Sequence, residues 1–222
     1  MPLHQQQPIT YLITSGETTP QTTPGDREYS QLLNLVAAAV AARVNLLQLR
    51  EKKLSTRVLY HLSRQAAEIT RGSDTRLLIN DRSDVARSTG AAGVHLTAGS
   101  IEPSVIRRTF GDDFLIGVST HSPEEARSAR DARADFAVFG PVFETASKHV
   151  YGEPVGLEKF EQAATILTQF PVLALGGVTL DNAADCFRAG ASGVAAIRLM
   201  NDPDQLARVV TEIGARFRSQ KE

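Results

Sequence analysis

The sequence predicts an α/β protein, a TIM (β/α)8 barrel folded as a single domain over residues 1–222. Eight short apolar runs recur along the chain, and segments with helical spacing separate them. The runs are continuous rather than alternating, which is typical of strands buried on both faces of a parallel sheet. A length of 222 residues suits eight such units in one barrel.

The expected strands are rich in β-branched and aliphatic residues, and several are followed directly by polar or glycine-rich segments. The first begins at "ITYLITSG", and the loose stretch at 16–26 is expected to be the loop that leads to the first helix. The eight strands are expected at 9–16, 45–52, 76–81, 93–98, 114–122, 136–143, 171–177 and 193–200.

The segments between the strands have helical composition and, in places, helix-start signals. Ser55 or Thr56 can cap the second helix, and Ser122 followed by Pro123 and two acids marks the start of the fifth. Gly190 is expected to end the seventh helix. The helices are expected at 28–43, 55–71, 83–89, 103–109, from 122 onward, 156–168, 179–190 and 203–219.

An open doubly wound sheet is the alternative fold. That fold normally has fewer strands and carries a glycine-rich GxGxxG turn after the first one. No such turn follows residues 9–16, so the barrel is favoured.

The charge balance limits the classes of partner. The chain has 24 Lys and Arg against 25 Asp and Glu, a net charge of −1, which argues against general affinity for nucleic acid or membrane surfaces. The single cysteine, no apparent signal peptide and no apolar run of membrane-spanning length predict a soluble cytoplasmic protein. A homo-oligomer is left open.

Polar residues gather where the expected strands end. In a barrel these ends lie at one mouth, which is where the reacting groups of such enzymes sit. The polar strand ends are Gln48, Arg50 and Lys52; Asn80 and Asp81; His95 and Thr97; Ser119 and His121; Thr145, Ser147 and Lys148; Gly176 and Gly177; Ile197 and Arg198.

Two cations stand out at the second strand end. Gln48, Arg50 and Lys52 are two residues apart, so on a strand they share one face. Charges in a walled cavity need partners, and a phosphate or diphosphate suits Arg and Lys together. A structural ion pair with Asp81 or Glu51 is the alternative.

Gly176-Gly177 is a second sign of an anion site. With the backbone amides after the eighth strand it matches the phosphate site that the last two loops of many barrels build, and Arg198 would reinforce it. A simple turn is the alternative. Asp81 could ligate Mg²⁺ or could pair with Arg50 or Arg82, and Cys186 is expected in the core.

Six motifs in order carry a family resemblance: "QLREK", "LLINDRSDVA", "GVHL", "IGVSTHSPEEA", "ADFAVFGPVFETASK" and "PVLALGGVTLDNAADCFRAGASGVAAI". Over about residues 9–200 the chain resembles thiamine-phosphate synthase and its relative TenI, the thiazole tautomerase. The synthase resemblance implies a barrel that joins a hydroxymethylpyrimidine diphosphate to thiazole phosphate and releases diphosphate. It implies phosphorylated pyrimidine and thiazole substrates, and Mg²⁺ as cofactor.

The family pattern implies a role for each matched residue. Arg50 and Lys52 would hold the diphosphate, with Asn80 and Lys148 nearby, and Asp81 would bind Mg²⁺. Gln48 and Ser119 would meet the pyrimidine. The thiazole phosphate would be bound by residues of the later loops, namely Thr145, Ser147, Gly176, Gly177 and the backbone amides near Ile197, with Arg198 beside them.

The chain departs from both members of the family. Ser100 stands where synthases carry the second acidic magnesium ligand, and serine is a poor substitute for a carboxylate. Pro141 stands where the tautomerase has its histidine, and Arg198 where synthases often have serine. Tautomerase activity, with His121 or His149 as the acid–base group, and a non-catalytic binder or scaffold therefore remain alternatives, and Glu102 or Asp112 could replace the missing ligand.

Overall fold

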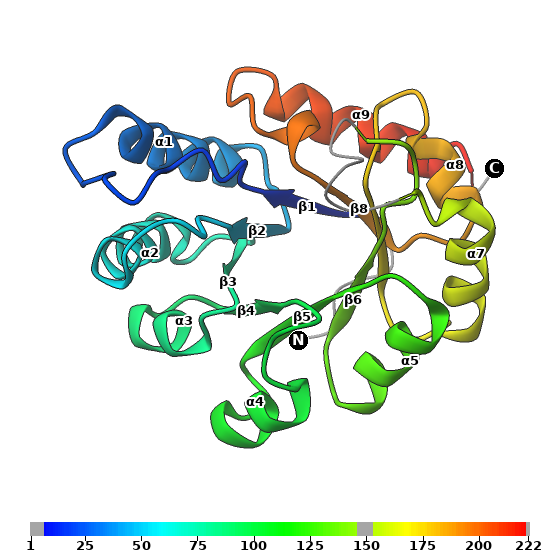
Figure 1. Ribbon diagram of the computed structural model, residues 1–222. Helices are drawn as coiled ribbons and strands as arrows, with labels where there is room; N and C mark the ends of the chain where they lie inside the picture. The colour runs from blue at the N-terminus through cyan, green and yellow to red at the C-terminus, as the bar shows by residue number, and fades with distance from the viewer. Residues whose placement is uncertain (1–6, 146–152, 221–222) are drawn as a thin grey trace.

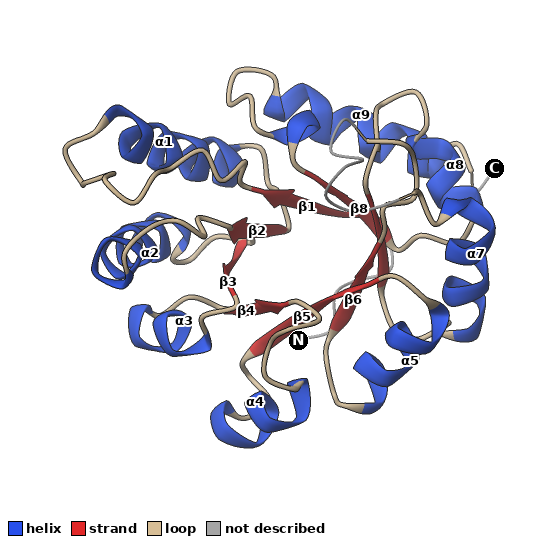
Figure 2. Ribbon diagram, in the orientation of Figure 1, coloured by secondary structure: helices blue, strands red, loops and turns tan. Residues whose placement is uncertain are grey.

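The computed structural model describes residues 7–145 and 153–220, and its eight parallel strands close into a barrel in sequence order. Figure 1 shows the helices arranged around the outside of the strands, and Figure 2 separates the two layers by colour. The barrel closes where β1 pairs with β8, with Tyr11 opposite Ala195, while its other side pairs with β2. The predicted fold class is confirmed.

Each expected strand forms at its predicted place, and the observed strands are shorter than the apolar runs. The strands are β1 (Ile9–Ile13), β2 (Leu46–Leu49), β3 (Arg76–Asn80), β4 (Gly93–Leu96), β5 (Leu115–Thr120), β6 (Phe136–Phe139), β7 (Val172–Leu175) and β8 (Gly193–Ala196).

The helices cover the outer face of the barrel. The predicted caps are present: the Ser55 hydroxyl accepts the N–H of Val58, and the Ser122 hydroxyl accepts the N–H of Glu125. The helices are α1 (Arg27–Ala41), α2 (Thr56–Thr70), α3 (Ser83–Thr89), α4 (Pro103–Phe110), α5 (Pro123–Asp131), α7 (Gly156–Ile166), α8 (Ala183–Arg188), the 3₁₀ turn η1 (Arg198–Met200) and α9 (Leu206–Arg218).

The apolar residues divide into two layers, which explains why the strand sequences are apolar without alternation. On β2, Leu46 points into the barrel and packs with Tyr11 and Phe136. Its neighbours Leu47 and Leu49 point outward and pack beneath the helices. Both faces of the sheet are therefore buried, as expected for a parallel barrel.

Two of the boundaries that differ from prediction bear on the site. β2 ends at Leu49, so Arg50 and Lys52 lie in the loop after the strand. The expected helix start at Thr179 is instead a turn, because Asn182 Oδ1 accepts the Thr179 N–H at 2.8 Å, and α8 begins at Ala183. In the part of the chain that the structure describes, no helix combines the length and the apolar character needed to span a bilayer.

Candidate active site

A cavity of about 760 Å³ opens at the carboxyl ends of the strands. Its wall is formed by residues that follow or end most of the strands, as the barrel architecture predicts. The predicted site residues that line it are Gln48, Arg50, Lys52, Asn80, Ser119, Thr145, Gly176, Gly177, Ile197 and Arg198.

Of the predicted site residues that the structure describes, one does not line the cavity. Asp81 is exposed at the end of β3 and does not contribute to the cavity wall. The alternative in which Asp81 pairs with Arg82 is not observed, since Arg82 pairs with Asp84 at 2.6 Å. Ser147 and Lys148, like His149, lie outside the described residues.

The β2 cations, Arg50 and Lys52, are held at the cavity wall by the loop that follows β2. The Thr14 hydroxyl accepts the Arg50 N–H at 2.9 Å and donates to the Glu51 carboxylate at 2.5 Å. Glu51 is buried and also accepts the Thr18 hydroxyl at 2.7 Å. Because the Glu51 carboxylate accepts two threonine hydroxyls, it fixes the loop. The alternative in which Glu51 forms an ion pair with these cations is therefore not supported.

Gln48 presents a buried amide to the same cavity. The side chain is 1% exposed, and its Nε2 has no hydrogen-bond partner among the described residues. A buried donor without a partner costs free energy, so such groups in native proteins usually meet a ligand or water. The Gln48 amide therefore indicates a bound group with an acceptor atom at this position.

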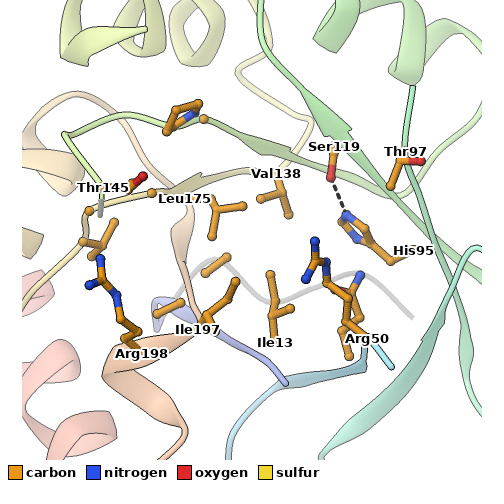
Figure 3. Close-up of a pocket in the computed structure, with 18 of the residues that line it drawn as sticks. Ile13, Arg50, His95, Thr97, Ser119, Val138, Thr145, Leu175, Ile197 and Arg198 are labelled. Atoms are coloured by element: carbon orange, nitrogen blue, oxygen red, sulfur yellow. Dashed lines mark hydrogen bonds between the residues drawn. The ribbon is translucent and has the colours of Figure 1, made fainter. Parts of the chain in front are cut away.

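The opposite side of the cavity contains a third cation. Figure 3 shows Arg198 near Thr145, across the cavity from Arg50 and His95. Ile13, Val138, Leu175 and Ile197 lie between the two arginines and form an apolar floor. The site can thus hold apolar or aromatic groups between two positively charged ends.

Gly176 and Gly177 bring backbone close to this second end. Gly177 has a φ of +66°, and a Cβ there would lie 2.5 Å from the carbonyl oxygen of Glu144. Only glycine fits such a position, so no side chain fills this part of the wall. The loop is held by Asn182, whose Nδ2 donates to the Gly177 carbonyl at 2.9 Å.

Asn201 fixes the loop that carries Arg198. Its Nδ2 donates to the carbonyls of Ile197 and Ile13, both at 2.7 Å, and its Oδ1 accepts the Ser15 N–H at 3.0 Å. The loops after β8 and β1 are therefore joined through one side chain. Sequence reasoning missed Asn201, because nothing in its neighbourhood marks the contact with β1.

His95, which the sequence places among the polar strand ends without a specific role, also lines the cavity. Its Nε2 lies 2.9 Å from Ser119 Oγ, and its Nδ1 lies 3.1 Å from the Tyr11 hydroxyl. Burial, with a further contribution from the positive charge of Arg50, lowers the pKa of His95 to about 3. The ring is therefore neutral near pH 7.

His121 occupies the rim of the cavity. Its Nδ1 is hydrogen-bonded to the carbonyl of Gly140, and its backbone N–H donates to Glu125 Oε2 at 2.7 Å. A ring that donates Nδ1–H to a carbonyl keeps a lone pair on Nε2, so His121 can accept a proton there.

The described residues do not form a metal centre of their own. No group of three or more His, Cys, Asp or Glu side chains in the described ranges could hold an ion. Ser100, at the position of the missing acid, closes a local turn by accepting the Thr97 N–H at 2.8 Å. Asp81, which follows the cavity-lining Asn80, would share a Mg²⁺ ion with a phosphorylated substrate, because Mg²⁺ is often bound by one or two carboxylates plus phosphate oxygens.

Neither displaced acid lies at the cavity wall. Glu102 accepts the Ser104 hydroxyl at the start of α4, at 3.3 Å. Asp112 pairs with Arg133 at 2.8 Å in the loop before β5, which is the opposite end of the barrel. The interpretation that either acid replaces the missing ligand is therefore not supported by the geometry.

Comparison with known proteins gives a consistent result. The family model described as thiamine monophosphate synthase matches residues 12–200. A Geobacter sulfurreducens protein is 44% identical over 89% of this chain and 89% of its own length. The thiamine-phosphate synthase of Roseiflexus sp. (strain RS-1) is 36% identical over 91% of this chain and 83% of its own.

A solved structure agrees with these relatives. The thiamine phosphate pyrophosphorylase from Pyrococcus furiosus superposes with a TM-score of 0.74 and 25% sequence identity, covering 94% of this chain and 98% of that one. The matched region contains all eight strand ends and the cavity they surround. On this evidence the chain belongs to the thiamine monophosphate synthase family.

Proposed function

We propose that this protein is a thiamine-phosphate synthase, a transferase that joins hydroxymethylpyrimidine diphosphate to thiazole phosphate. In this reaction the bond between the pyrimidine methylene carbon and the diphosphate oxygen breaks, and a bond from that carbon to the thiazole nitrogen forms. Diphosphate leaves with the electron pair of the broken bond. The observation that supports this function best is the cavity with cations at both ends and an apolar floor between them.

The β2 cations would neutralise the diphosphate as it leaves. Charge grows on the leaving oxygen as the carbon–oxygen bond breaks, so fixed positive groups stabilise the transition state more than the substrate. Arg50 is suited to a forked contact with phosphate oxygens, and Lys52 supplies a second charge. Asn80, on the same wall, would donate to the diphosphate.

The floor and the second end would position the thiazole. The apolar side chains of Val138, Leu175 and Ile197 suit two stacked heterocycles and keep water from the cationic intermediate. Thr145, Arg198 and the backbone at Gly176 and Gly177 would hold the thiazole phosphate. The predicted roles of Ser147 and Lys148, in the loop after β6, stay proposals.

Mg²⁺ would be held by Asp81 together with the diphosphate of the substrate. When bound, the ion supplies further neutralisation of the leaving group. With one protein carboxylate, the affinity for Mg²⁺ is expected to depend strongly on whether the substrate is present. Replacing Asp81 with asparagine should therefore raise the Mg²⁺ concentration needed for half-maximal activity, and an unchanged requirement would exclude Asp81 as the ligand.

The central test is turnover of both phosphorylated substrates with Mg²⁺, followed by chromatography of thiamine phosphate. The Arg50→Ala and Lys52→Ala variants should each lower kcat/KM about 100-fold or more, as expected for loss of a charge that stabilises the transition state. Lys53→Ala is the matched control, because Lys53 is adjacent in sequence, exposed, and does not line the cavity. No thiamine phosphate from the unmodified protein, or equal losses in all three variants, would contradict the proposal.

Thiazole tautomerase activity is the second candidate, and His121 is the observation that favours it. Its Nε2 is available as a base at the rim of the cavity. A tautomerase would interconvert a carboxythiazole phosphate without any pyrimidine substrate, and His121→Gln should abolish that activity. If neither tautomerisation nor condensation occurs while phosphorylated ligands bind, the chain is a non-catalytic binder. The cytoplasmic location remains a prediction from the sequence, and the oligomeric state stays open.

A further inference from the structure

Tyr11, His95 and Ser119 form a chain of hydrogen bonds that runs from the barrel interior to the cavity. The Tyr11 hydroxyl lies 3.1 Å from His95 Nδ1, and His95 Nε2 lies 2.9 Å from Ser119 Oγ. Tyr11 and His95 are buried, whereas Ser119 is half-buried at the cavity wall (Figure 3). The three residues come from β1, β4 and β5.

The packing holds the His95 ring in one orientation. The ring of Phe136 meets Tyr11 edge-on, with centroids 5.6 Å apart, and lies 6.1 Å from His95. Gly117 makes room for both rings, since a Cβ there would lie 2.3 Å from Phe136 Cζ and 2.8 Å from His95 Nδ1. The chain of hydrogen bonds is therefore part of a packed core rather than a mobile surface contact.

The direction of the hydrogen bonds follows from counting donors. Both hydroxyls and the neutral imidazole can each either donate or accept. If His95 carried its proton on Nδ1, it would donate to Tyr11, and the buried Tyr11 O–H would have no acceptor among the described residues. A buried donor without an acceptor is costly. With the proton on Nε2 instead, Tyr11 donates to Nδ1, and Nε2–H donates to Ser119.

We infer that Tyr11 and His95 are positioning residues that fix Ser119 as a hydrogen-bond donor into the cavity. Since His95 donates to Ser119 Oγ, the serine hydrogen is free to point toward a ligand. This hydrogen can be donated to an acceptor atom of a ligand, and a bare ring nitrogen of a heteroaromatic ring provides such an acceptor.

This inference deepens the proposed function, on which its choice of ligand rests. Gln48 Nε2 is a buried donor at the same cavity and has no partner among the described residues. A pyrimidine with two ring nitrogens can accept from both Ser119 and Gln48. These hydrogen bonds would thereby select the pyrimidine ring of the substrate independently of the charge on its diphosphate.

The first test measures the His95 tautomer by ¹⁵N NMR of the ligand-free protein labelled on histidine, at pH 7. The His95 signals are assigned by their loss in His95→Gln. We expect a neutral ring with its proton on Nε2, and in Tyr11→Phe a shift of part of the population to Nδ1–H. Tyr29→Phe is the matched control, because it removes a tyrosine hydroxyl that donates to Gln65 at 2.6 Å, away from the cavity. A wild-type ring protonated on Nδ1 would overturn the inference.

The second test measures binding of hydroxymethylpyrimidine diphosphate by calorimetry, with no thiazole phosphate present. Tyr11→Phe and Ser119→Ala should each weaken binding about three- to tenfold, the value of one hydrogen bond, and Tyr29→Phe should not. Ser119→Thr keeps the hydroxyl and should retain most of the wild-type affinity. The comparison of Ser119→Ala with Ser119→Thr tests the recognition role even if Tyr11→Phe does not fold. Wild-type affinity in both Tyr11→Phe and Ser119→Ala would overturn the recognition role. An Nε2–H ring in a protein that does not bind this ligand would support the hydrogen-bond chain and contradict the proposed function.

Discussion

His95 is an example of a residue whose chemistry is decided by its surroundings rather than by its type. In the sequence it stands in the motif "GVHL", which suggests a polar strand end. In the barrel it is 2% exposed, lies beside the positive charge of Arg50, and bonds to two neutral hydroxyls. His95 therefore contributes directional hydrogen bonds to the site and does not contribute a charge.

The pH dependence of stability should reveal this burial. The folded-state pKa of about 3 lies below the usual value of 6.5, so the unfolded chain takes up a proton that the folded protein does not. The free energy of unfolding should therefore fall as the pH drops below 6.5, by up to about 1.4 kcal/mol per pH unit from His95. Urea denaturation at pH 7, 6 and 5 measures this slope.

The matched variants are His95→Gln and His61→Gln. The first removes the titrating ring from the core and should flatten the slope, although its stability at pH 7 will also be lower. The second changes an exposed histidine on α2 and should keep the wild-type slope. Equal slopes in wild type and His95→Gln would show that His95 is not buried as a neutral ring.

At the scale of elements, one buried cation serves the fold rather than the site. Arg107 on α4 donates to the carbonyls of Gly111 and Phe114 at 3.0 and 2.8 Å, and to that of Arg133 at 3.0 Å. It also pairs with Asp135 at 2.7 Å. These bonds join the two loops that enter β5 and β6, at the end of the barrel opposite the cavity.

Replacing Arg107 should therefore affect stability and not catalysis. Arg107→Ala leaves buried carbonyls without donors, and we expect the free energy of unfolding to fall by about 2–4 kcal/mol. Arg108→Ala, at the exposed neighbouring position, should change it by less than about 0.5 kcal/mol. Denaturant titration gives both values, and kcat/KM of the folded Arg107→Ala protein should match wild type. A loss of stability in Arg108→Ala as large as that in Arg107→Ala would contradict this role.

The elements themselves could be predicted because each strand is an unbroken apolar run followed by polar residues. The ends of the elements could not. β2 stops at Leu49 because the Arg50 N–H is taken by the Thr14 hydroxyl, and α8 starts late because Asn182 builds a turn with Thr179. Both boundaries depend on side chains that accept backbone hydrogen bonds, and hydrophobic periodicity does not report them.

The site could be predicted as a set of strand ends, since barrel geometry brings such ends together. The links between its members could not, because they join distant residues of ordinary type. Tyr11 and His95 are separated by 84 positions, and Ser15 and Asn201 by 186. Asp81 was expected at the cavity on family grounds, and its exposed position, off the cavity wall, became visible only in the folded chain.

The whole molecule is held together by closure of the barrel through β1 and β8, the first and last strands in sequence order. Neither half of the barrel can keep all its strand hydrogen bonds without the other. We therefore expect a single cooperative unfolding transition. This also tests the prediction that the chain is a single domain.

The lone cysteine is a convenient probe of that transition. Cys186 on α8 is fully buried. Its burial and, to a smaller extent, the negative charge of Asp185 raise the pKa of its thiol to about 12. At pH 8 the thiol should stay protonated and unreactive toward a disulfide reagent until the protein unfolds. Its exposure in urea should follow the loss of helical circular dichroism. Labelling at lower urea than the loss of helix would show that α8 opens separately.

The two charged ends of the cavity are carried by loops on different parts of the barrel, Arg50 and Lys52 after β2 and Arg198 after β8. Each loop has its own anchor, Thr14 with Glu51 for the former and Asn201 for the latter. Replacement of one loop, in evolution or by engineering, can thus change the preference for one co-substrate and leave binding of the other unchanged. A relative with a new pairing of heterocycles could arise by such piecewise replacement, without rebuilding the scaffold.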